Sequence, residues 1–132
     1  MTSALPPAPP SGAAWTPAVL DEVALDRLRE LDPDGRHGVL RRVFSAFEIS
    51  LMRMLVQLGA EREQGNAGVV SSVAHTLKSS SASVGALQLS KACAEVERRL
   101  RDHQTGDLDA DVEKLLTEGG SALLAVRAML HG

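Results

Sequence analysis

The sequence predicts an all-α protein, an antiparallel four-helix bundle with an additional N-terminal helix. Apolar residues recur at helical spacing along most of the chain, and no segment shows strand alternation or the Gly-rich turns of hairpins. Aromatic residues make up only 2% of the 132 residues. Leucine, valine and alanine must therefore fill the core, which suits helices better than a β-sandwich.

The N-terminal part divides into a tail and a first helix. Residues 1–14 are rich in proline and alanine, and we expect a disordered tail because this composition sustains neither a helix nor a strand. A single domain is expected over residues 15–132. Its first helix is predicted to begin with Thr16 as the N-cap and Pro17 in the first helical position, and to end near Leu31.

The next two helices follow from apolar stripes. The longest stripe runs from Leu40 to Leu58 at alternating spacings of four and three residues, and it is lost at residues 59–65. Asn66 is placed to cap the following helix, which we expect to end near Gly85.

Two more helices complete the predicted bundle, with apolar positions at 89–100 and 108–129 around a polar loop. Gly119 and Gly120 lie inside the last one, where each glycine costs about 1 kcal/mol relative to alanine. The pair indicates a close helix crossing or a kink, and a break into two helices is the alternative. Four long helices with short connections form an antiparallel bundle, and we expect the first helix across one end.

Composition excludes several classes of function. A net charge of −3 gives no basic surface for nucleic acid, and a single cysteine, Cys93, excludes an internal disulfide and a multi-cysteine metal site. No apolar run approaches the roughly 20 residues that span a bilayer, and the N-terminus lacks the features of a secretory signal. We therefore expect a cytoplasmic, free-standing, monomeric module that has no metal site and binds neither nucleic acid nor a membrane.

His75 is the candidate functional residue, because helical geometry turns it away from the core. The apolar side of the third helix is formed by Val70, Val73, Leu77, Ser81 and Val84. At about 100° per residue these cluster within roughly 80°, with His75 nearly opposite. Its neighbours on the outer face are small, which sacrifices helix propensity but leaves room for a partner protein. On periodicity alone, the alternative that His75 is an exposed histidine without a function explains the pattern about equally well.

A resemblance to a known family decides between these interpretations. The run from His75 to Ala86, His-Thr-Leu-Lys-Ser-Ser-Ser-Ala-Ser-Val-Gly-Ala, resembles the signature of histidine-containing phosphotransfer (Hpt) domains. The agreement continues in the next helix at Leu89, Cys93 and Val96-Glu97. It covers about residues 73–97, with one departure: Ser79 stands where the family usually has glycine.

The resemblance implies a role for each residue. His75 would be the phosphoacceptor, Lys78 would stabilise the charge of the phosphoryl group, and Glu97 could bind one ring N–H and orient the imidazole. A partner would dock on the exposed face of the third helix and on adjacent parts of the second and fourth helices. The docking residues on the third helix would be Ser71, Ser72, Ser79, Ala82 and Gly85.

The implied function is a phosphate relay. The protein would accept a phosphoryl group on His75 from a receiver-domain phospho-aspartate, or from a hybrid sensor kinase, and pass it to a response regulator. No nucleotide-binding motif or acidic Mg²⁺ cluster is present in the sequence, so we expect no enzyme activity and no cofactor of its own, with Mg²⁺ in the partner receiver domain. The alternative is a helical-bundle adaptor that binds a receiver or kinase domain without carrying phosphate. Arg98, Arg99 and Arg101 could help dock an acidic receiver, although a solvated helix face explains them more simply.

Overall fold

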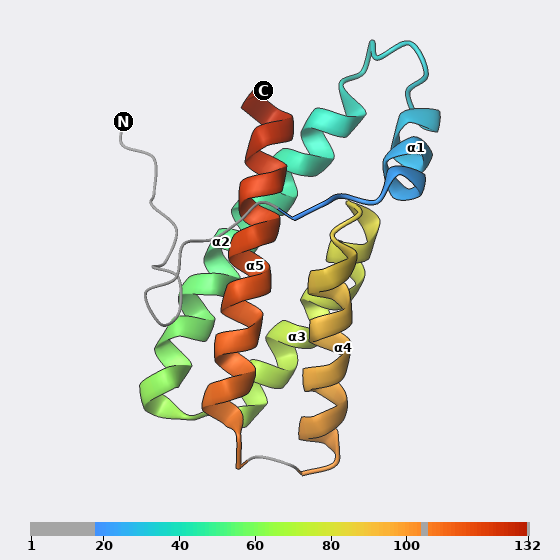
Figure 1. Cartoon of the computed structure of the whole chain (residues 1–132). Helices are drawn as coiled ribbons and strands as arrows, with labels where there is room; N and C mark the ends of the chain where they lie inside the picture. Colours follow the sequence, from blue (N-terminus) through green and yellow to red (C-terminus); the bar gives the residue numbers. More distant parts are fainter. Residues whose placement is uncertain (1–17, 104–105, 132) are drawn as a thin grey trace, which may run out of the picture.

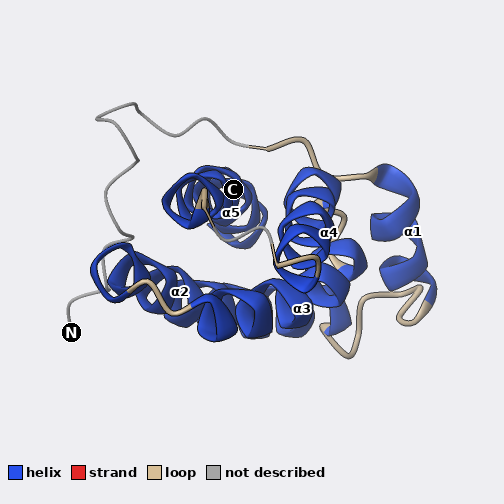
Figure 2. Cartoon of the chain, turned by 90° about the horizontal axis from the view of Figure 1, so that it is seen from below, coloured by secondary structure: helices blue, strands red, loops and turns tan. Residues whose placement is uncertain are grey.

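The computed structural model describes residues 18–103 and 106–131, which form five helices and no strand. The helices are α1 (Glu22–Glu30), α2 (Val39–Gln64), α3 (Ala67–Ser83), α4 (Leu87–Arg101) and α5 (Leu108–His131). The four long helices alternate in direction, and α1 lies at one end of the bundle beside the turn between α3 and α4 (Figure 1). Seen along the bundle, α2 and α3 form one layer and α5 and α4 the other (Figure 2). The predicted fold class is confirmed.

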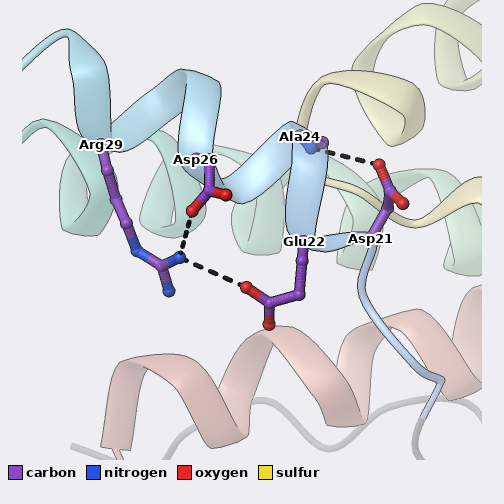
Figure 3. Close-up of polar contacts among 5 residues, drawn as sticks. All are labelled: Asp21, Glu22, Ala24, Asp26 and Arg29. Carbon is purple, nitrogen blue, oxygen red and sulfur yellow. Dashed lines mark hydrogen bonds and ion pairs between the residues drawn. The ribbon is translucent and has the colours of Figure 1, made fainter.

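The first helix begins later than we predicted. Residues 18–21 are not helical, and Asp21 is the N-cap of α1. Its carboxylate accepts a hydrogen bond from the backbone N–H of Ala24 at 3.1 Å (Figure 3). A carboxylate in this position satisfies a free N–H of the first turn and interacts favourably with the helix dipole, so Asp21 takes the role we assigned to Thr16. Thr16 and Pro17 themselves, like the predicted tail, lie outside the described residues.

The loop between α1 and α2 is organised by Asp32. Its carboxylate accepts hydrogen bonds from the backbone N–H groups of His37 and Val39, each at 3.2 Å. These bonds serve the N-terminus of α2, where the N-cap residue Gly38 offers no side-chain acceptor. Burial raises the pKa of Asp32, but the hydrogen bonds from Val39 and His37 outweigh it and leave the pKa below its ordinary value.

The connection between α2 and α3 is capped from both sides. The side chain of Asn66 accepts a hydrogen bond from Val69 N–H at 3.2 Å, which confirms the predicted cap. The carboxylate of Glu61 accepts one from Asn66 N–H at 2.9 Å. α2 therefore continues to Gln64, beyond the end of its apolar stripe, because a buried glutamate closes its last turn.

All five helices contribute to one apolar core. Leu25 of α1, Phe44 of α2, Val70 of α3, Leu89 of α4 and Val112 of α5 belong to the same buried cluster. α5 is continuous through Gly119, so the alternative of a break into two helices is wrong. A Cβ atom on Gly119 would overlap Cδ2 of Leu55, which shows that this glycine lets α5 cross close to α2.

α2 is long and apolar enough to cross a membrane by length and composition alone, although no apolar run in the sequence suggested a span. The core helix of a soluble bundle meets the same two conditions. Here α2 packs mainly against α5 and also against α3. Its buried residues are Phe44, Phe47, Leu51, Leu55, Leu58 and Glu61. The helix is therefore weak evidence for a membrane span.

Candidate functional site

His75 lies in the middle of α3 on the side that faces away from the core. The buried residues of α3 are Val70, Val73, Ala74, Leu77 and Ser81. The imidazole of His75 is 71% exposed. The orientation expected from helical geometry is therefore present, and a second protein can reach the ring.

Glu97 of α4 contacts both polar side chains of the site. Its Oε2 lies 2.6 Å from Nδ1 of His75, and its Oε1 lies 2.6 Å from Nζ of Lys78. The glutamate side chain is only 14% exposed, whereas the lysine side chain is 38% exposed. The largely buried carboxylate of Glu97 on α4 thus binds two side chains of α3, His75 and Lys78, which are both more exposed than it is.

The charges of the site follow from these contacts. The hydrogen bond from Lys78, and after it that from His75, lowers the pKa of Glu97 below its ordinary value of 4.5. Glu97 is therefore a carboxylate at neutral pH and can accept hydrogen bonds from both groups. When Nδ1 of His75 donates its hydrogen to Glu97, the lone pair of the neutral ring is on Nε2.

The hairpin of α3 and α4 explains why these residues meet. His75 lies eleven residues before Ala86, and Glu97 lies eleven residues after it. Antiparallel helices of equal rise place such positions at the same level. Ser90 of α4 fixes this register, since its hydroxyl donates to the backbone carbonyl of Lys78 at 2.7 Å.

Small side chains surround His75 on the outer face of α3. Ser72, Ser79 and Ala82 are exposed, and Ser71 is partly exposed. These four residues lie on the face where we expected a partner to dock.

Gly85 does not belong to this face, which corrects our expectation. It is buried, and a Cβ atom on it would lie 2.8 Å from the backbone nitrogen of Asp21. α3 ends at Ser83, and Gly85 has φ +84° in the turn that follows. Gly85 therefore permits the reversal between α3 and α4 and the close packing of the segment that leads into α1.

Two further serines of α3 were not singled out from the sequence. The hydroxyl of Ser80 donates to the carbonyl of Thr76 at 3.3 Å, and that of Ser83 donates to the carbonyl of Ser79 at 3.1 Å. A hydroxyl bonded to the preceding turn lies against its own helix. Neither hydroxyl therefore extends far from α3, and serines at regular intervals along a helix are the signal that could have predicted these bonds.

Large apolar side chains on the outside of α2 were also missed. Ile49 and Val56 are exposed and lie seven residues, or about two turns, apart on one side of the helix. Val56 is nearly level with His75, since Val56 lies nine residues before Gly65 and His75 lies nine residues after Asn66. Apolar residues outside the core stripe of α2 are the signal that could have identified them.

Arg99 is engaged at the other end of α4. Its guanidinium pairs with Asp111 at 3.2 Å and with Asp107 at 3.4 Å. Burial raises the pKa of Asp111, and the charge of Arg99 opposes this effect. Of the three arginines that we considered for docking, Arg99 is thus held by carboxylates of its own chain.

No group of three or more His, Cys, Asp or Glu side chains that could hold a metal ion occurs within residues 18–103 and 106–131. The site itself combines one imidazole, one ammonium and one carboxylate. Our expectation that Mg²⁺ belongs to a partner remains a prediction.

Comparison with known protein families gives a match to the Hpt domain over residues 42–131. The chain belongs to the Hpt domain family. The matched segment includes His75, Lys78 and Glu97, and the resemblance of the run that begins at His75 is confirmed. Helix α1 precedes the matched segment.

A solved Hpt structure has a similar fold. The crystal structure of histidine-containing phosphotransfer protein B (HptB) from Pseudomonas aeruginosa PAO1 matches with a TM-score of 0.70 and 24% identity. The match covers 83% of this chain and 92% of the HptB chain. At this identity the likeness shows the fold alone. No curated protein matches the sequence.

Family membership gives the chain a histidine phosphotransfer role in phosphorelays. Hpt domains generally carry phosphate without being enzymes, and they work with receiver domains and response regulators. They are also generally soluble. The side chains of His75, Lys78 and Glu97 form the candidate site for this role.

Proposed function

We propose that this Hpt domain accepts a phosphoryl group on Nε2 of His75 from a receiver-domain phospho-aspartate and passes it to a second receiver domain. The contact that carries the proposal is the 2.6 Å distance between Oε2 of Glu97 and Nδ1 of His75. Because Nδ1 is occupied by the carboxylate, the nucleophilic lone pair is on Nε2 of an exposed ring.

The transfer is a displacement at phosphorus. The Nε2 lone pair forms the new N–P bond while the bond from phosphorus to the aspartyl oxygen breaks, and the electron pair returns to the aspartate carboxylate. The ring becomes a phosphorylated imidazolium that keeps its Nδ1–H on Glu97. The negative charge of Glu97 then offsets the positive charge of the ring. The same step in reverse delivers the phosphoryl group to the aspartate of the next receiver.

Lys78 would stabilise the negative charge of the phosphoryl group. Its ammonium has three hydrogens, of which one is directed to Oε1 of Glu97 at 2.6 Å. The other two are available to phosphoryl oxygens at a side chain that is 38% exposed. Ser79, in place of the family's glycine, is small and exposed, so it leaves room for the partner.

The partners would be the receiver domain of a hybrid sensor histidine kinase, a response regulator, or both. They would dock on the face of α3 formed by Ser71, Ser72, Ser79 and Ala82 and would supply the Mg²⁺ for transfer. The Hpt domain itself would act in the cytoplasm as a monomeric carrier with no cofactor.

The test is transfer from a phosphorylated receiver domain. Wild-type protein should acquire phosphate that is labile in acid and stable in alkali, as a phosphoramidate is, and His75→Gln should acquire none. His103→Gln is the matched control, because His103 is also exposed but lies after α4, and it should be labelled like the wild type. Binding of several receivers without any label on the wild type would instead favour the adaptor.

A further inference from the structure

The hydroxyl of Ser79 is exposed and is not used within its own helix. The hydroxyls of Ser80 and Ser83 donate to carbonyls of the preceding turn, at 3.3 Å and 3.1 Å. The hydroxyl of Ser79, by contrast, has no hydrogen-bond partner within the described part of the chain. It is therefore available to a group that reaches α3 from outside.

Ser79 flanks His75 on one side, and Lys78 flanks it on the other. At about 100° per residue, Ser79 lies one turn after His75 and about 40° to one side, whereas Lys78 lies about 60° to the opposite side. Residues four apart on a helix have their Cβ atoms about 5–6 Å apart. The turn after the histidine thus presents an ammonium on one side of the ring and a hydroxyl on the other.

The orientation of the ring directs Nε2 to the side of Ser79. Glu97 of α4 contacts both Nδ1 of His75 and Nζ of Lys78, so α4 lies on the lysine side. In an imidazole, Nε2 lies on the ring edge opposite Nδ1. The nitrogen that would carry phosphate and the hydroxyl of Ser79 are therefore both on the side of α3 that faces away from α4.

Ser72 is the other serine on this side of α3, one turn before His75. Its hydroxyl also lacks a hydrogen-bond partner within the described residues. The Cα–Cβ bonds of a helix tilt toward its N-terminus, so Ser79 leans toward the level of His75 and Ser72 leans away from it. Ser79 is thus the better placed of the two donors.

We propose that the hydroxyl of Ser79 donates a hydrogen bond to an oxygen of the phosphoryl group on Nε2 of His75, opposite Lys78. This inference rests on the proposed function. A hydrogen bond to a charged acceptor is stronger than one between neutral groups, so this bond stabilises the phosphorylated state. Because the family usually has glycine here, which has no hydroxyl, the donor is a property of this chain. It shifts the equilibrium with a receiver toward phosphate on His75.

The experiment measures the equilibrium constant for phosphoryl exchange with one receiver domain, as the ratio of the forward and reverse transfer rates below saturation. Ser79→Ala and Ser79→Gly both lack the hydroxyl and should lower this constant about fivefold to tenfold. Ser79→Thr retains a hydroxyl and should keep the wild-type value. Thr117→Ala is the matched control, because it removes an exposed hydroxyl from α5, and it should also keep that value.

A second measurement does not involve a receiver. The protein is labelled with phosphoramidate, and the ³¹P NMR signal of the phosphohistidine is recorded. The signal should shift in Ser79→Ala and stay at the wild-type position in Thr117→Ala. Circular dichroism checks that each variant is folded.

The outcomes separate this role from a role in docking. If the residue only limits the approach of a receiver, Ser79→Gly raises the forward and reverse rates equally and leaves the equilibrium constant unchanged, which overturns the hydrogen bond. An equal loss in Thr117→Ala also overturns it. In both cases labelling of wild-type His75 leaves the proposed function standing. A wild-type protein that neither the receiver nor phosphoramidate labels overturns the proposed function and this inference together.

Discussion

Oε2 of Glu97 lies 2.6 Å from Nδ1 of His75, although the two residues are 22 positions apart and belong to different helices. The same carboxylate binds Lys78 through its other oxygen. One glutamate thus fixes the orientation of the ring, the position of the ammonium and the spacing of α3 and α4 at this level. The predictions about the site follow from this shared carboxylate.

Replacing Glu97 with alanine should slow phosphotransfer to His75 about tenfold, or about 1.4 kcal/mol in the barrier. Without the acceptor, the neutral ring divides between two tautomers and is free to rotate. Glu97→Gln retains an acceptor oxygen and should recover part of the rate. The readouts are the transfer rate and the ¹⁵N shifts of the imidazole, which report the tautomer. Wild-type ring shifts in Glu97→Ala would show that the carboxylate does not select the tautomer.

Replacing Lys78 with alanine should slow transfer by a similar factor, about tenfold, while the fold stays intact. The lost ammonium leaves charge on the transferring phosphoryl group without a partner from this chain. Lys91→Ala is the matched control, since it removes an exposed lysine from α4 and should transfer at the wild-type rate. Single-turnover transfer measures the effect, and circular dichroism checks the fold. Equal rates in the two variants would remove Lys78 from the mechanism.

Helical periodicity was sufficient to orient His75. Each residue advances about 100°, so the buried positions of α3 alone place the ring on the outside. Periodicity did not place Gly85 on this face; it was assigned there with the residues that the resemblance implied, and the assignment fails because α3 ends at Ser83. With φ +84°, Gly85 turns back beneath the segment that precedes α1.

The residue at which α1 begins is set by a long-range contact, which cannot be predicted from the neighbouring residues in the sequence. We predicted the start at Thr16-Pro17 and did not consider Asp21-Glu22, although both pairs have residue types that favour a helix start. The structure uses the second because the backbone N–H of Asp21 is bonded to the carbonyl of Gly85, more than sixty residues away. The contact of His75 with Glu97 also joins two different helices, 22 residues apart, and the resemblance to the Hpt signature, rather than periodicity, predicted it.

The contribution of Glu97 to stability should depend on pH in the acidic range. Its pKa is lowered in the folded protein, so its stabilisation is fully present above the unfolded value near 4.5 and is lost as the pH falls through the lower folded pKa. The difference in free energy of unfolding between wild type and Glu97→Gln should therefore shrink below about pH 4.5. Urea denaturation at a series of pH values measures it.

A matched variant provides the baseline for this pH series. Glu30→Gln removes an exposed glutamate that has no ion-pair partner within the described residues. Asp111 acts in the opposite direction, because a raised pKa makes its ionisation costly in the folded state, and that cost disappears as the pH falls. It is common to all three proteins and cancels in the differences. A Glu97 difference that grew on acidification would contradict the assigned ion pair.

Gly85→Ala should lower the free energy of unfolding by about 2–4 kcal/mol. A side chain at φ +84° costs about 1–2 kcal/mol, and the new Cβ would also lie 2.8 Å from the backbone nitrogen of Asp21, which must move. Gly35→Ala separates the two effects, since Gly35 has φ +71° but nothing within 4 Å of its Cβ position. Gly35→Ala should lose only the cost of the backbone conformation, about 1–2 kcal/mol. Urea denaturation of both variants checks this, and equal losses would mean that the packing of the Asp21 segment on the α3–α4 turn contributes nothing.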